Sequence, residues 1–155
     1  MNAFRRTLAS LALVAAVVAT PACAKEPAGA KGACVPVVRD GWIRLVPGGM
    51  PMHGGFGRIE NTCDAPATIT GAKSAAYGSV ELHETTLVDG VSRMRAVPTL
   101  SIAAKGNAEF KPGGLHMMLM DPVSPLKAGD KVEIDFALQD GRAVRGTFVV
   151  RAPGG

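Results

Sequence analysis

Aromatic side chains are scarce in this chain of 155 residues: five Phe, one Tyr and one Trp make up 5% of it. Charged residues are also few, at 19%, and the formal net charge is only +4. No Lys/Arg run or aromatic-rich basic stripe is present, so we do not expect a nucleic-acid partner. The hydrophobic content of 47% excludes a disordered chain. The length suits one domain and excludes a multidomain enzyme.

The first 24 residues contain no acidic residue and no glycine. Arg5 and Arg6 precede an apolar stretch at 8–19, and small residues follow at 22–24. This order is typical of a signal peptide, and the stretch is shorter than the roughly 20 residues of a transmembrane helix. We therefore expect cleavage near Ala24 and a periplasmic mature protein with no membrane span.

Other interpretations of the signal stay open. The apolar stretch could be a helical anchor, and the paired arginines could direct twin-arginine export. Lipid attachment at Cys23 fits less well, because Thr20 stands where a lipoprotein signal usually has Leu. After the signal peptide at 1–24, we expect a flexible leader at 25–33 and a folded domain at 34–151.

Removal of the signal leaves two cysteines, Cys34 and Cys63, which are not in a CxxC motif. In an oxidising compartment an even pair favours one disulfide. Closing this loop would stabilise the fold by about 3.5 kcal/mol on chain-entropy grounds. Metal binding by the two thiolates is the alternative, and their isolation makes it the weaker one.

The mature chain has no convincing helical period; short alternating segments and frequent turn residues predict strands instead. Asp-Gly pairs at 89–90 and 140–141 predict hairpins, and Gly57 suggests a bulge. Helix is expected only as a turn or two at 75–78. Eight or nine evenly spaced strands indicate an antiparallel β-sandwich. The expected strands are 37–46, 55–61, 67–73, 79–85, 91–97, 100–104, 115–120, 132–138 and 143–150.

All three histidines and six of the seven methionines lie between residues 50 and 120. Taken singly, a Met is usually core filler and a His is usually hydrogen-bonded. Taken together, His83, Met94, His116 and Met118 can converge. The hairpin places His83 near Met94, and His116 and Met118 share one face of a strand. Two imidazoles and two thioethers form a soft donor set that selects Cu(I), whereas zinc favours thiolate, His or carboxylate.

The spacing His-x10-Met-x21-His-x-Met, in VELHETTLVDGVSRMR and PGGLHMMLM, resembles that of the periplasmic PCu(A)C copper chaperones. Gly-Trp-Ile-Arg, Gly-Arg-Ile-Glu-Asn and Lys-Ala-Gly-Asp extend the resemblance over 42–150. It implies an all-β, cupredoxin-like, antiparallel Greek-key sandwich or barrel with Cu(I) on those four residues. It also implies delivery toward the CuA centre of cytochrome c oxidase, with subunit II or another copper assembly factor as recipient.

Some members of that family carry a Met/His-rich C-terminal tail that helps to bind Cu(II). This chain ends in Arg-Ala-Pro-Gly-Gly, so Cu(II) is only a second candidate ion. Met50, Met52 and His53 form a compact segment that we interpret as an auxiliary copper contact or a lid. The alternative is a flexible loop with exposed thioethers.

Four residues near these candidate ligands also have expected positions or roles. Met117 has the opposite parity to Met118 and is expected in the core, and Met120 is expected to lie too far along the strand. Glu81 and Glu84 flank His83 and either orient it or are solvated surface charges.

Three other functions compete with the chaperone. A blue-copper-like electron carrier needs a Cys thiolate beside two His. A structural or adhesive β-sandwich would leave the His and Met residues incidental. An enzyme is not expected, because the chain has no nucleophile elbow, zinc-protease motif or phosphate loop.

Overall fold

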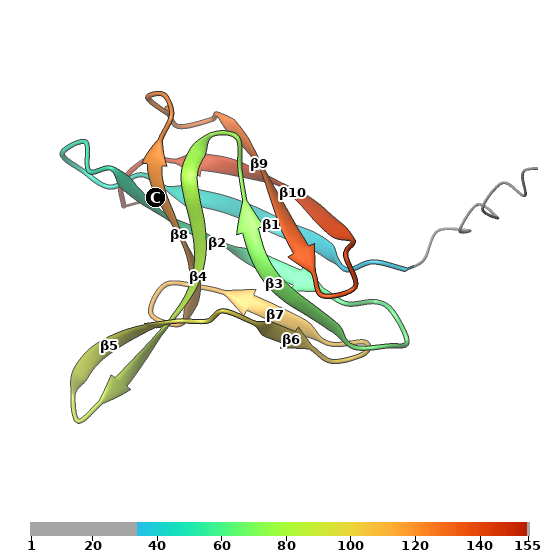
Figure 1. Cartoon of the computed structure of the whole chain (residues 1–155). Helices are drawn as coiled ribbons and strands as arrows, with labels where there is room; N and C mark the ends of the chain where they lie inside the picture. The colour runs from blue at the N-terminus through green and yellow to red at the C-terminus, as the bar shows by residue number, and fades with distance from the viewer. Residues whose placement is uncertain (1–33, 155) are drawn as a thin grey trace, which may run out of the picture. The chain divides into compact units, whose positions relative to one another are not determined.

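The computed structural model describes residues 34–154 (Figure 1). The expected signal peptide and leader lie outside these residues. The described part contains ten strands and no helix, and therefore no helix able to cross a membrane. The strands are β1 Val37–Arg44, β2 Met52–Glu60, β3 Ala67–Lys73, β4 Tyr77–Val88, β5 Val91–Ala96, β6 Leu100–Ile102, β7 Asn107–Phe110, β8 Leu115–Pro122, β9 Lys131–Leu138 and β10 Ala143–Arg151.

The strands form one sheet in the order β5-β4-β8-β2-β1-β10-β9-β3-β6, with β7 paired to β2. An additional pairing of Ala72 in β3 with Val80 in β4 closes seven of these strands into a barrel. The predicted cupredoxin-like all-β class is confirmed. One pairing departs from the expected antiparallel pattern, because β1 runs parallel to β10.

Alternating apolar residues fill the barrel. Along β9 and β10 every second side chain is buried while its neighbours are exposed or half-buried, as expected for sheets with one face on the core. Phe136 and Phe148 are fully buried, with ring centroids 6.2 Å apart. Met117 is also buried, at 1% exposure, as predicted from its parity.

Both Asp-Gly hairpins are confirmed. Asp89 and Gly90 have φ of 51° and 76°, the left-handed conformations that a tight hairpin turn requires. The bulge is confirmed as well: two residues of β1, Asp40 and Gly41, lie opposite Gly57 of β2. A Cβ at Gly57 would lie 3.0 Å from the carbonyl oxygen of Arg39, so the bulge needs glycine there.

The helical turn expected at 75–78 is wrong. The Ser74 hydroxyl accepts a hydrogen bond from the Ala76 amide, and the resulting turn leads directly into β4 at Tyr77. Strand β7 was not predicted, because it is only four residues long. Strand β2 begins at Met52, earlier than predicted, because it continues through the glycine pair Gly54 and Gly55.

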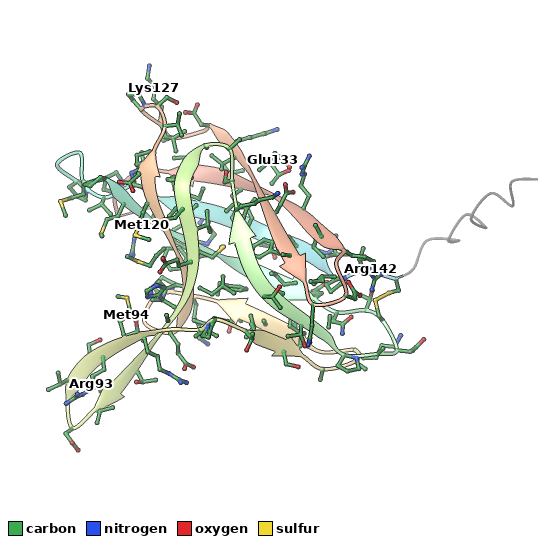
Figure 2. The ribbon with its side chains drawn as sticks, viewed as in Figure 1. Arg93, Met94, Met120, Lys127, Glu133 and Arg142 are labelled. Carbon is green, nitrogen blue, oxygen red and sulfur yellow. A yellow bond between two sulfur atoms is a disulfide. The ribbon has the colours of Figure 1, made fainter. Side chains whose placement is uncertain are left out.

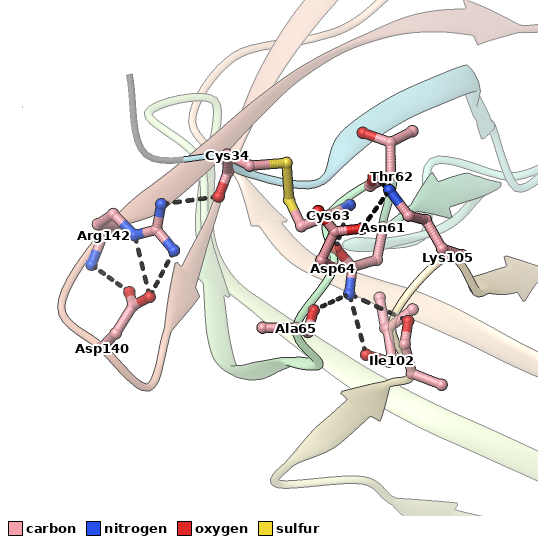
Figure 3. Close-up of a disulfide and its surroundings, with 11 residues drawn as sticks. Cys34, Asn61, Thr62, Cys63, Asp64, Ala65, Ile102, Lys105, Asp140 and Arg142 are labelled. Carbon is pink, nitrogen blue, oxygen red and sulfur yellow. Dashed lines mark hydrogen bonds and ion pairs between the residues drawn. A yellow bond between two sulfur atoms is a disulfide. The ribbon is translucent and has the colours of Figure 1, made fainter. Parts of the chain in front are cut away.

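The predicted disulfide joins Cys34 to Cys63 (Figure 3). It ties the segment before β1 to the loop after β2. Beside it the buried Asn61 amide donates hydrogen bonds to the carbonyls of Ala65, Ile102 and Ala103. Because both sulfurs are in the disulfide, the alternative of two metal-binding thiolates is wrong for this structure.

Candidate metal centre

The four candidate ligands lie on three adjacent strands, β5, β4 and β8. His83 and His116 are direct cross-strand partners, and their ring centroids are 6.0 Å apart. Met94 is the cross-strand partner of Thr85, one diagonal step from His83 on the same face of the β4–β5 hairpin. Met118 follows His116 by two residues and shares its face. The sheet therefore places all four residues that the sequence spacing selected on one face of three adjacent strands.

Glu81 fixes the orientation of the His83 ring. Nε2 of His83 lies 2.9 Å from Oε2 of Glu81. A carboxylate only accepts, so Nε2 is the donor, and in the neutral ring Nδ1 carries the lone pair. That Nδ1 is buried and has no hydrogen-bond partner within residues 34–154. A buried, unpartnered acceptor is costly unless something binds it, and a metal ion fits this nitrogen.

His116 is fixed in the same way by the backbone. Its Nδ1 donates to the carbonyl oxygen of Gly114 at 2.9 Å. The lone pair of the neutral ring is therefore on Nε2. His116 is buried, and it lies across from His83 on the neighbouring strand. The two rings thus offer one free nitrogen each, which is the arrangement that oriented metal-binding histidines have.

A hollow of about 230 Å³ opens beside these residues. Met94, His116 and Met118 line it, whereas His83 is not among its lining residues, and Met94 is 55% exposed. Figure 2 shows Met94 on the projecting β4–β5 hairpin. Gly54 is the cross-strand partner of Met118, and the Phe56 ring packs over it, 3.0 Å from where a Cβ would stand. The other lining residues are Arg44, Val46, Met52, His53, Phe56, Thr85, Pro112 and Gly113.

The hollow has no acidic lining. Arg44 places its guanidinium 5.2 Å from the centre of the Phe56 ring, and Arg151 lies 4.6 Å from the Trp42 ring in the same way. Glu84 pairs with Arg95 at 2.6 Å, so of the two predicted orienting carboxylates only Glu81 serves His83. Within residues 34–154 no group of three His, Cys, Asp or Glu side chains is arranged to hold a metal ion. A four-donor site here therefore needs the thioethers.

Met50, Met52 and His53 are divided between two hollows. Met52 and His53 belong to β2, so the loop expected there is wrong for both, and as neighbours in a strand they face opposite ways. Nδ1 of His53 is hydrogen-bonded to the Tyr77 hydroxyl at 2.8 Å, and burial lowers the pKa of His53. Met52 and His53 border the hollow described above, whereas Met50 and His53 border a separate one of about 390 Å³.

Among the seven lining residues of the hollow that were missed from sequence are Arg44, Gly54 and Phe56. They lie on β1 and β2, far in sequence from the predicted ligands. The available signal was the glycine pair at 54–55, since glycine inside a strand often marks a close approach or an open site. Met120 lines neither hollow, as its position along β8 predicted.

Comparison with known proteins places this chain in a family. Residues 37–150 match the family described as putative lipoprotein LpqE-like. The chain belongs to the LpqE-like family. Its relatives include a putative lipoprotein, Lxx21020, of Leifsonia xyli subsp. xyli, which is 34% identical over 132 residues, covering 84% of this chain and 77% of that protein.

Solved structures relate this LpqE-like chain to PCuAC domains. The solution structure of CuI-DR1885 from Deinococcus radiodurans is 30% identical, with 80% of this chain and 83% of that one covered and a TM-score of 0.59. The copper-bound PCuAC domain from PmoF2, 22% identical with 75% and 92% covered, shares the fold with a TM-score of 0.61. The predicted PCuAC-like family is confirmed.

Proposed function

We propose that this chain is a Cu(I)-binding metallochaperone, with the ion held by His83, Met94, His116 and Met118. The single observation that carries the proposal is the buried, unpartnered Nδ1 of His83, whose ring lies 6.0 Å from that of its cross-strand partner His116. The soft, neutral donor set supports Cu(I) because thioethers favour it over harder ions. The solved structure of CuI-DR1885, which is 30% identical to this chain, is named for bound Cu(I) and supports the same ion.

The proposed cellular role is delivery of copper in the periplasm, toward the CuA centre of cytochrome c oxidase. The signal-like segment and the lipoprotein names of the family support export. Those names also bring back lipid attachment at Cys23 as the alternative to cleavage near Ala24. Intact mass of the protein isolated from its own cells separates the two, because acylation at Cys23 adds the mass of the lipid.

The competing functions make different predictions. A blue-copper carrier would need a thiolate, but Cys34 and Cys63 are joined to each other. It would also give an intensely coloured Cu(II) form. A structural or adhesive β-sandwich would bind no Cu(I) with high affinity. The chaperone function involves no catalysis.

The deciding experiment is a Cu(I) competition titration of the chain from residue 25 onward. We expect one Cu(I) per chain, and a loss of about 100-fold in affinity for His116→Ala. Met120→Leu is the matched control, because Met120 shares the face of Met118 but does not line the hollow. Failure of the wild type to bind Cu(I) would leave the structural sandwich as the better function.

A further inference from the structure

The β4–β5 hairpin extends from the barrel as an arm, defined here as residues 85–95 (Figure 1). Every residue of β5 is exposed. Yet the arm carries four large apolar side chains in the open: Leu87, Val88, Val91 and Met94. Residues 34–154 expose only three other large apolar side chains, Met50, Val123 and Val149. Apolar side chains gathered on a projecting element are typical of a surface that a partner covers.

The cross-strand register divides the arm into two faces. Thr85 pairs with Met94 and Leu87 pairs with Ser92, so Leu87 and Met94 share the face of His83. Val88 pairs with Val91 and belongs to the opposite face. Leu87 is 75% exposed. Leu87 and Met94 thus continue the wall of the metal hollow outward along one face of the arm, which they share with Thr85 and Ser92.

The barrel side of the hollow is basic. Arg44 and Arg151 are cross-strand partners on β1 and β10, so their side chains lie on one face. Both guanidiniums lie over aromatic rings, Phe56 and Trp42. Neither forms an ion pair with a carboxylate within residues 34–154. Two adjacent guanidiniums without intramolecular carboxylates complement acidic side chains of another molecule.

We propose that the copper acceptor docks on this surface, defined as Leu87, Met94, Arg44 and Arg151, and that it presents an apolar patch flanked by Asp or Glu around its own copper ligands. This proposal rests on the proposed function. The apolar part of the acceptor covers Leu87, and its carboxylates pair with the two arginines. A second copy of this chain fits poorly, because a two-fold contact pairs the surface with itself, and the surface contains no carboxylate to meet the arginines.

The position of Met94 sets the order of ligand exchange. Met94 is half-exposed on the docking surface, whereas His116 is buried and His83 is mostly covered. An incoming imidazole or thioether of the acceptor forms its bond to Cu(I) as the bond to the Met94 sulfur breaks. The ion stays Cu(I), no electron moves, and the free thioether needs no proton.

The test measures Cu(I) transfer from the loaded chain to the soluble CuA domain of cytochrome c oxidase subunit II, and separately to dithiothreitol. The variants are Leu87→Ser and Arg151→Glu. Each has a matched control on the other face of the arm: Val88→Ser for the apolar change and Arg93→Glu for the charge reversal, since Arg93 pairs across with Thr86 there. Cu(I) affinity and thermal unfolding are measured for all four.

We expect Leu87→Ser and Arg151→Glu to slow transfer to the CuA domain by about tenfold, and Arg151→Glu to weaken its salt dependence. Transfer to dithiothreitol, Cu(I) affinity and both controls should stay within about twofold of wild type. Equal transfer rates in variants and controls, or no transfer to the domain, would overturn the docking proposal. So would concentration-dependent dimers that Leu87→Ser abolishes. Failure of the wild type to bind Cu(I) is a separate result, which would refute the proposed function itself.

Discussion

Oε2 of Glu81 accepts a hydrogen bond from Nε2 of His83 at 2.9 Å, on the face of β4 that carries the candidate metal centre. The carboxylate selects the tautomer that leaves the buried Nδ1 of His83 free. Glu81 itself is half-exposed and lines no part of the hollow. It therefore acts on copper only through the ring that it holds.

Replacing Glu81 by Gln should lower Cu(I) affinity by about tenfold or more, as the loss of groups that orient metal-binding histidines usually does. The amide can still accept from Nε2, but it lacks the charge that raises the basicity of the ring. Glu84→Gln is the control, because Glu84 pairs with Arg95 on the other face of the hairpin. Competition titration measures both. Equal losses in the two variants would contradict an orienting role for Glu81.

The two thioethers should decide the preference for Cu(I). The double change of Met94 and Met118 to Leu keeps the apolar volume but removes both sulfur donors, so Cu(I) affinity should fall most in this variant. Changing both to His should strengthen Cu(II) and narrow the difference between the two oxidation states. Affinities are measured for both ions at a single pH, because His protonation competes with metal. X-ray absorption of the wild-type Cu(I) form should show sulfur neighbours of the ion directly. If the Leu variant binds Cu(I) with wild-type affinity, the two Met side chains only pack and do not bind the ion.

Removing the disulfide should lower the stability of the fold but leave the Cu(I) affinity unchanged. The changes Cys34→Ser and Cys63→Ser together should lower the free energy of unfolding by about 3.5 kcal/mol, because they release a loop in the unfolded chain. Neither cysteine lines the hollow. Urea unfolding measures the loss, and titration at a temperature where the variant is folded should give wild-type Cu(I) affinity. A folded variant that no longer binds Cu(I) would contradict this separation.

Acid should destabilise the copper-free protein partly through His53. Burial lowers the pKa of His53 below its ordinary value of 6.5. As the pH falls through 6.5, the unfolded chain binds a proton that the folded chain still excludes, so the free energy of unfolding decreases. His53→Gln should therefore show a shallower fall between pH 7 and pH 5, by urea unfolding at each pH. Tyr77→Phe keeps the imidazole but removes its hydrogen-bond partner, and it should keep the steeper slope. An unchanged slope in His53→Gln would assign the acid sensitivity to other groups.

Local patterns predicted much of this molecule. Alternation located most strands, and the Asp-Gly pairs located both hairpins, because turn chemistry acts over a few residues. The candidate ligands could be selected from sequence for the same reason: His83 and Met94 are joined by one hairpin, and His116 and Met118 lie on one strand. The spacing of four soft donors therefore carried three-dimensional information.

What local patterns could not predict are contacts made by distant pairing. Arg44 and Phe56 reach the hollow only because β2 pairs with β8 and β1 pairs with β2. The parallel pairing of β1 with β10 has no local signal either. Met50, Met52 and His53 looked like one group in sequence, but the alternation of β2 directs Met52 and His53 to opposite faces.

The single residue pair that closes the barrel, Ala72 with Val80, has a mechanical consequence. Strand β4 is bound to β8 at seven positions and to β5 at six, but to β3 at only this one. All four candidate ligands thus belong to one three-stranded ribbon, β5-β4-β8. It is joined to the rest of the barrel along β8 and, at the other edge of β4, by this one residue pair. A single residue pair is a weak attachment, so we expect the ribbon to shift as a unit when this pair opens, which would move the arm without separating the cross-strand partners His83 and His116.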